Sequence, residues 1–428
     1  MRVLTPQDSA YESVRHVYSR RGSPASVYLP TSTAEVAEAL STVRANGHAL
    51  AIRSGGHGIS SSATNDGGDV IDLRDLDLIE PLGDRAVRVG PGARWGTVAR
   101  SLEPLGLAIS SGDSGDVGVG GLATTGGIGL LGRAHGLTID HLRRAEIVTA
   151  DGSRLIVSDD EEPDLFWAVR GAGANVGIVT SFEFDAAEVG QVIQLVAAYR
   201  PAEVASFLER WGTLVESAPR AVSAFLYLTG GPSPMAQATI VAANPDVDSV
   251  GPALERFLRL PGLVGQRAGL VPYASVPVTG GQVHSGAQRA ATHSGLANHL
   301  DESLSRRLTS LLAGGADMVQ IRSVGGAIND IPSSSTAYAH RHQNFSITAV
   351  SVHGGSSFDA AWAPVRARAD GLYLSFESNH DPQHVLEAFP PSTLERLRAI
   401  KTKWDPDDVF SQNFDVSNTA DRPTATSR

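Results

Sequence analysis

The chain has 428 residues, more than one hydrophobic core usually organises, so we expect about two domains. Its 35 basic and 46 acidic side chains give a net charge of −11, which disfavours nucleic acid and anionic lipid as partners. The lack of cysteine excludes disulfides, thiolate metal sites and thiol nucleophiles. The sequence contains no apolar run of about 18 residues, so we expect no membrane-spanning helix.

Secondary structure alternates in the N-terminal part. Ser32 and Glu35 form a capping-box pattern before Val36 and Leu40, and Gly47 ends the repeat, which predicts a helix. Apolar runs bounded by turn residues predict strands at residues 49–52, 70–73 and 86–89, and a helical repeat follows at 95–105. The N-terminus has no apolar core of signal-peptide length, so we expect a cytoplasmic protein.

The next segment is dominated by glycine. Ten of the 25 residues from Gly112 to Gly136 are glycine, and each interior glycine costs a helix or strand about 0.5–1 kcal/mol relative to alanine. We therefore expect a loop whose shape is set by the backbone.

Strands and helices return after this loop. A hairpin is predicted at residues 146–157, with a helix at 164–170 and a strand at 177–184. Near residue 190 the elements become longer, which suggests a domain boundary. Strands are expected at 192–199, 222–228, 238–243, 318–324 and 345–352, and helices at 202–216 and 394–403.

Three short motifs resemble functional sites but lack the sequence context that those sites require. The spacing of Gly127, Gly129 and Gly132 matches a dinucleotide fingerprint, but no strand pattern precedes it and no helix pattern follows. The run at residues 112–115 resembles a serine-protease nucleophile loop without an identifiable histidine partner. His340 and His342 alternate as on a strand, yet no carboxylate cluster accompanies them, so no metal site is expected.

The run Arg53-Ser54-Gly55-Gly56-His57-Gly58 is more informative. It follows a predicted strand, and glycines around an imidazole allow the ring to approach a ligand closely. Alone, the run is equally compatible with a histidine in an ordinary surface loop. The segments that follow it decide between these two interpretations.

Several segments, in this order and spacing, resemble the berberine-bridge-enzyme-like FAD-linked oxidases. The resemblance rests on residues 53–57, 118–122, 126–129, 136–140, 150–152, 164–171 and 175–180. In the C-terminal half it continues at residues 325–331, 336–341 and 396–413. It implies an α+β fold with an FAD-binding domain and a substrate domain (residues 191–385). The FAD-binding domain should consist of two small subdomains and be built from residues 1–190 together with the C-terminal segment 386–428. The substrate domain should be an antiparallel sheet backed by helices.

The resemblance also implies the cofactor site. Glycine-rich loops allow several backbone N–H groups to converge on the pyrophosphate of FAD. His57 corresponds to the histidine bonded to the flavin, and Ser114 replaces the cysteine that gives many members a second bond, so FAD attached through His57 only is expected. The implied FAD-binding residues are Arg53, Ser54, Gly55, Gly56, His57, Gly58, Gly112, Asp113, Gly118, Gly121, Gly127, Gly129, Leu137, Gly177, Val179 and Asn413.

Five residues are candidates for the chemical step. Asp330 matches an acid of the substrate-domain signature and is the first choice for a base, although a turn-capping role before Pro332 is equally compatible. Tyr338, Tyr373, Glu377 and His340 are further pocket candidates, although a packed or surface position is at least as compatible with each of them. Phe376 stands where many members have tyrosine, and it cannot act as a phenolate base.

The implied activity is hydride transfer from an alcohol or amine carbon of a small molecule to flavin N5. Valine at position 117, near the implied oxygen entry, favours oxygen as acceptor, giving hydrogen peroxide. Alternatives are a flavin dehydrogenase, a tailoring oxidase of secondary metabolism, or a non-catalytic flavin-binding protein. Substrate identity is open, and the chain is expected to be a monomer or homodimer without nucleic-acid or membrane partners.

Overall fold

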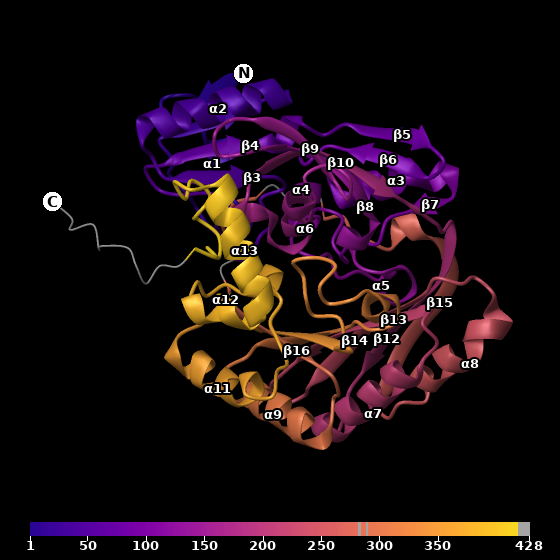
Figure 1. Ribbon diagram of the computed structural model, residues 1–428. Coiled ribbons are helices and arrows are strands. Elements are labelled where there is room, and N and C mark those ends of the chain that lie inside the picture. The colour runs from indigo at the N-terminus through magenta and orange to yellow at the C-terminus, as the bar shows by residue number, and fades with distance from the viewer. Residues whose placement is uncertain (281–283, 288–289, 418–428) are drawn as a thin grey trace.

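The computed structural model describes residues 1–280, 284–287 and 290–417. The N-terminal half contains two main sheets (Figure 1). In the first, β2, β4 and β3 run parallel and β1 pairs antiparallel with β2. Its strands are β1 (Arg2–Leu4), β2 (Ser26–Leu29), β4 (Asp69–Asp72) and β3 (Leu50–Arg53).

The second sheet is antiparallel and has the order β5-β6-β10-β8-β9. Its strands are β5 (Ile79–Gly83), β6 (Ala86–Val89), β10 (Ile178–Asp185), β8 (Leu142–Val148) and β9 (Arg154–Ser158). The expected hairpin at 146–157 is thus β8 and β9, and Gly152 in its turn has φ +85°. Two short strands, β7 (Leu107–Ala108) and β11 (Ala187–Glu188), pair nearby.

Six α-helices belong to the described part of this half. The predicted first helix is α2 (Thr33–Asn46): the Ser32 hydroxyl accepts the Glu35 N–H at 3.3 Å, and Gly47 ends the helix in a left-handed conformation. The others are α1 (Glu12–Arg15), α3 (Trp95–Leu102), α4 (Val119–Leu122), α5 (Gly132–His135) and α6 (Pro163–Ala172).

A seven-stranded antiparallel sheet forms the other half. Its order is β15 (Leu263–Pro272), β12 (Gln191–Tyr199), β14 (Met235–Ala242), β13 (Val222–Thr229), β17 (Met318–Ser323), β18 (Phe345–Ser351) and β16 (Ala291–Ala297). One face is covered by α7 (Val204–Ser217), α8 (Val247–Leu258), α9 (Glu302–Ala313) and α11 (Ser356–Arg366), as Figure 1 shows. This is the expected antiparallel sheet backed by helices, and the α+β class is confirmed.

The C-terminal segment packs against the second sheet. Leu394, Leu397 and Ile400 of α13 (Pro391–Trp404) join the core formed by β6, β8, β10 and α6. The short helices α10 (Ala327–Asp330) and α12 (Pro382–Ala388) lie in the connections. The division of the chain at about residues 190 and 386 stays a prediction.

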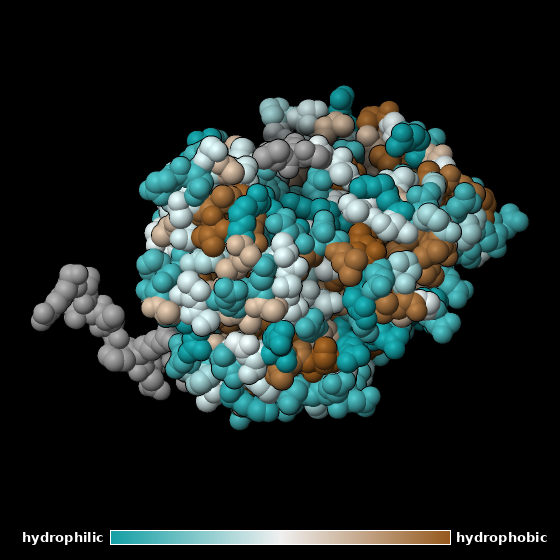
Figure 2. All heavy atoms as spheres, turned by 90° about the horizontal axis from the view of Figure 1, so that it is seen from above, coloured by the Kyte–Doolittle hydropathy of each residue, from teal (hydrophilic) through white to brown (hydrophobic). Residues whose placement is uncertain are grey.

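No helix in the described ranges is long and apolar enough to cross a membrane. Seen over the first two sheets, the surface carries separate hydrophobic patches between hydrophilic residues rather than one continuous apolar area (Figure 2).

Candidate functional site

A cavity of about 410 Å³ lies between the N-terminal half and the large sheet. On one side it is lined by residues 54–58, 112–125 and 171–177, which we call the glycine wall. On the other side it is lined by Gln320 and Arg322 of β17 and by residues 373–376, which we call the sheet wall. The two walls differ in construction, since backbone forms most of the first and side chains form the second.

His57 lies on the turn after β3 and lines the cavity. Tyr18 stacks on its imidazole with ring centroids 4.3 Å apart, and His284 meets it edge-on at 5.6 Å. Burial, and then the nearby His284, lowers the pKa of His57, which favours the neutral imidazole. A neutral ring with a free nitrogen lone pair is the form that can bond to carbon.

The backbone of this turn is available for hydrogen bonding. The N–H groups of Gly55, Gly56, His57 and Gly58 pair with no described residue. Successive unpaired N–H groups in a turn form a concavity that suits an anion such as a phosphate.

Gly55 and Gly118 cross in close contact. A Cβ added to Gly118 would lie 2.2 Å from the Gly55 nitrogen, and one added to Gly55 would lie 2.3 Å from the Gly118 nitrogen. Arg94 supports the crossing because its Nη1 donates to the Gly55 carbonyl at 2.8 Å. Neither glycine can be replaced without separating the two loops of the glycine wall.

The segment 112–136 is mainly loop, as expected, but it holds two single-turn helices, α4 and α5. The expectation that no helix follows Gly132 is wrong, because α5 begins there. The helix spans only four residues, and no strand precedes Gly127, so the segment does not form a dinucleotide-binding strand–turn–helix unit.

Most predicted FAD-binding residues line the cavity. These are Ser54, Gly55, Gly56, His57, Gly58, Gly112, Asp113, Gly118, Gly121, Gly177, Val179 and Asn413. Sequence reasoning missed several other lining residues that no motif marks, among them Tyr18, Gln320, Arg322 and Gln412.

Four predicted FAD-binding residues lie behind the lining instead: Arg53, Gly127, Gly129 and Leu137. The buried Arg53 guanidinium donates to the Ala63 carbonyl at 3.0 Å and pairs with Asp72 at 3.3 Å. A Cβ on Gly129 would lie 1.8 Å from the Ser111 carbonyl oxygen, so this glycine is needed for packing. These positions shape the wall without facing the cavity.

Of the predicted catalytic residues, Tyr373 lines the cavity. Its hydroxyl accepts a hydrogen bond from the Gly127 N–H at 2.9 Å, which leaves the O–H proton free to be donated. The next three residues, Leu374–Phe376, form a short 3₁₀ turn. Tyr338 packs edge-on behind Tyr373 with centroids 5.8 Å apart, and burial raises its pKa strongly.

The expectation that Asp330 faces the cavity is wrong. Asp330 ends the short helix α10, its side chain is 62% exposed, and it pairs with Arg220 at 2.5 Å on the surface. The positive φ angles of Gly325 and Gly326 turn the chain after β17, so the carboxylate points away from the pocket. Asp330 therefore cannot serve as the base there.

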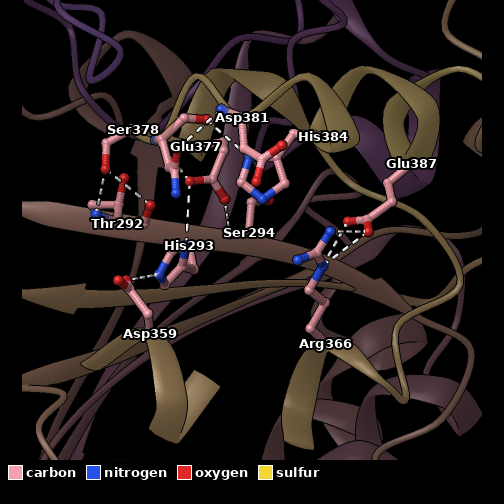
Figure 3. A network of polar contacts seen from close by, with 11 residues as sticks. Thr292, His293, Ser294, Asp359, Arg366, Glu377, Ser378, Asp381, His384 and Glu387 are labelled. Carbon is pink, nitrogen blue, oxygen red and sulfur yellow. Dashed lines mark hydrogen bonds and ion pairs between the residues drawn. The ribbon is translucent and has the colours of Figure 1, made fainter. Parts of the chain in front are cut away.

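Glu377 is also outside the cavity. Its buried carboxylate accepts the Ser294 N–H at 3.1 Å and the Asn379 N–H at 2.9 Å, and contacts His293 Nδ1 at 3.3 Å (Figure 3). His293 in turn contacts Asp359 at 2.9 Å. Glu377 thus fastens the 373–381 segment to the edge strand β16.

Burial and two neighbouring carboxylates shift the pKa of His293 in opposite directions. Burial would lower the pKa of its imidazole, but the hydrogen bonds and charges of Glu377 and Asp359 outweigh burial, so the pKa is raised. His340 behaves differently: burial lowers its pKa to about 4, and its Nε2 contacts the Ala388 carbonyl. It lies in a loop, not on the strand suggested by the sequence.

The residues present fit FAD. Besides the free N–H groups of residues 55–58, two lining side chains have a buried polar atom without a partner in the described chain, namely Gln412 Oε1 and Arg322 Nη1. A buried polar atom without a hydrogen bond is unfavourable unless a ligand or a water molecule supplies the missing partner. Such a lining suits a large polar cofactor at one end and a polar substrate at the other.

Comparison with known proteins supports this assignment. The family model described as "FAD binding domain" matches residues 24–158, and the model described as "Berberine and berberine like" matches residues 373–415. The (R)-6-hydroxynicotine oxidase of Paenarthrobacter nicotinovorans is 39% identical over 191 residues. That match spans 44% of this chain and 42% of the relative, less than half of either.

Solved structures match over nearly the whole chain. The 6-hydroxy-D-nicotine oxidase of Arthrobacter nicotinovorans superposes with a TM-score of 0.84 at 25% identity, covering 97% of both chains. The glucooligosaccharide oxidase of Acremonium strictum, which carries a 6-S-cysteinyl, 8α-N1-histidyl FAD, gives a TM-score of 0.84 at 22% identity, with 97% of each chain covered. This second likeness shows the fold alone.

Proposed function

We propose that the chain is a berberine-bridge-enzyme-like FAD-linked oxidase that acts on an alcohol or amine carbon of a small organic molecule. The observation that carries the proposal is the two-walled cavity, which places His57 and free backbone N–H groups on one side and polar and aromatic side chains on the other. Bound FAD would supply the redox chemistry, accepting a hydride at its N5 atom and passing electrons to oxygen.

The glycine wall holds the cofactor in this proposal. His57 forms the covalent bond, because its pKa is lowered and it lies on the cavity surface. Ser114 also lines the cavity, but a hydroxyl does not replace a thiolate in the second linkage, so one bond is expected. Residues 55–58 and 118–121 are the backbone that would approach the negatively charged parts of the cofactor.

The sheet wall orients the substrate. Tyr373 is the predicted catalytic residue that lines the cavity, and its hydroxyl accepts a hydrogen bond from the Gly127 N–H. We assign its hydroxyl the hydrogen bond to the substrate oxygen or nitrogen, with water as the acceptor of the proton that this atom loses. Val117, a small residue of the cavity lining, leaves space for oxygen.

Incubation of the purified yellow protein with a panel of alcohols and amines tests this function. We expect anaerobic bleaching of the flavin by at least one panel member and stoichiometric hydrogen peroxide when air is admitted. Bleaching without peroxide would identify a dehydrogenase. A flavin that no panel member reduces would favour a non-catalytic flavin-binding protein.

A further inference from the structure

The sheet wall contains a buried cation that no motif marks. Arg322 lies on β17 with a side chain only 5% exposed, and it lines the cavity. Its Nη2 contacts Asp113 at 3.5 Å, the limit for a hydrogen bond, and its Nη1 has no partner in the described chain. A buried guanidinium with one long contact lacks the compensation that such a charge normally has.

Aromatic rings hold this guanidinium in place. Its central carbon lies 4.2 Å from the Phe376 ring centroid, 5.5 Å from that of Phe225 and 6.0 Å from that of Tyr227. Ring faces stabilise a cation and reduce its contact with water, but they accept no strong hydrogen bond from its N–H groups. The N–H groups therefore still need an acceptor.

A second polar side chain, that of Gln320, lies beside Arg322 on the same strand. Gln320 lies two residues earlier on β17, so both side chains project from the same face of the sheet, and both line the cavity. The Gln320 amide forms no side-chain hydrogen bond with the described chain. Apart from the His57 imidazole, the acidic and basic side chains of the described lining are limited to Asp113 and Arg322, and Asp113 is the more exposed of the two.

We propose that Arg322 is a specificity residue that binds a carboxylate of the substrate, with Gln320 as a second donor. The preferred substrates are then carboxylic acids that also carry the alcohol or amine to be oxidised. This rests on the proposed function, because the cavity must accept the substrate beside the flavin. Arginine suits the role, since its planar fork of donors matches a carboxylate.

Binding to the flavin-loaded protein tests the proposal without turnover. Benzoate, neutral benzamide and cationic benzylamine are titrated, and binding is followed by the change in flavin absorbance. We expect benzoate to bind about tenfold or more tightly than benzamide, because a hydrogen bond to a charged group is worth about 1.5–3 kcal/mol. Benzylamine should bind most weakly of the three.

Substitutions of Arg322 test whether this residue causes the preference for benzoate. Arg322→Gln should remove the preference for benzoate, and Arg322→Lys should keep part of it, because lysine retains the charge without the planar fork. Arg220→Gln is the matched control, since Arg220 is exposed, pairs with Asp330 and lies outside the cavity lining. This control should bind all three probes like the wild type.

The proposal is wrong if wild-type protein shows no preference for benzoate, including the case in which benzoate gives no spectral change up to its solubility. A preference that survives in Arg322→Gln also overturns it. A shift of the flavin spectrum in Arg322→Gln without any probe, with benzoate binding retained, would assign the guanidinium to the cofactor instead. If benzoate binds through Arg322 but no substrate yields peroxide, the oxidase function fails while the anion site stands.

Discussion

The two walls of the cavity are built by opposite means. The glycine wall is shaped by close backbone approach, as where Gly55 and Gly118 cross with no room for a side chain. The sheet wall depends on side chains such as Arg322, Tyr373 and Phe376 that project from separate segments. A backbone-built wall suits a constant cofactor, whereas a side-chain wall can change with the substrate while the fold is kept.

The largest expected effect is on the rate of flavin reduction, which should depend on the sheet wall, while flavin content depends on the glycine wall. Tyr373→Phe removes the hydroxyl of a residue that lines the cavity, so anaerobic flavin reduction by an identified substrate should slow by about 10²–10⁴-fold. Flavin content should not change. Tyr338→Phe is the control, because Tyr338 lies behind Tyr373, and stopped-flow reduction should stay near the wild-type rate. Equal loss in both variants would remove Tyr373 from its assigned role.

The second prediction breaks the glycine wall. Gly118→Ala forces a Cβ against the Gly55 backbone, which should lower the free energy of unfolding by about 1–3 kcal/mol and reduce the flavin retained after gel filtration. Gly269→Ala is the matched change, since Gly269 lies within strand β15 and its added Cβ would have no neighbour within 4 Å. There we expect a gain of about 0.5–1 kcal/mol. Equal stability of the two variants in urea titrations would argue against the close crossing.

The smallest effect is on stability and concerns the contacts of Glu377 with the edge strand β16. Glu377→Gln removes the charge that raises the pKa of His293 and should cost about 1–2 kcal/mol of stability near pH 6. Because the folded pKa is raised, this contribution is fully present below the unfolded value of about 6.5 and is lost as pH rises through the folded pKa. The difference between wild type and variant in urea should therefore shrink from pH 6 to pH 9. A constant or growing difference would show that the charge on His293 is not involved.

The sequence indicates the glycine wall better than the sheet wall, for a physical reason. Close backbone approach requires glycine, so Gly55, Gly118 and their neighbours leave a compositional trace. Local signals also placed the α2 helix through the Ser32 cap and Gly47. Even so, Arg53 and Gly129 belong behind the lining, because a motif does not say which of its residues faces the ligand.

The sheet wall depends on packing between distant segments. Arg322 sits in a strand pattern, and its exposure to the cavity follows from the neighbours β13 and β18, which no local signal specifies. Asp330 and Glu377 were misplaced because the direction of a carboxylate depends on the turn after β17 and on the edge strand β16. Leu374–Phe376 form a 3₁₀ turn, whose side chains do not alternate as on a strand.

The central claim is that the cavity holds FAD bonded to His57 alone, and peptide mass analysis tests it most directly. The purified protein is precipitated with acid, digested, and the peptides containing His57 and Ser114 are weighed. The account predicts a yellow pellet, a mass increase of one FAD on the His57 peptide, none on the Ser114 peptide, and a colourless pellet for His57→Ala. Flavin released wholly into the supernatant of the wild type, or found on the Ser114 peptide, would contradict it.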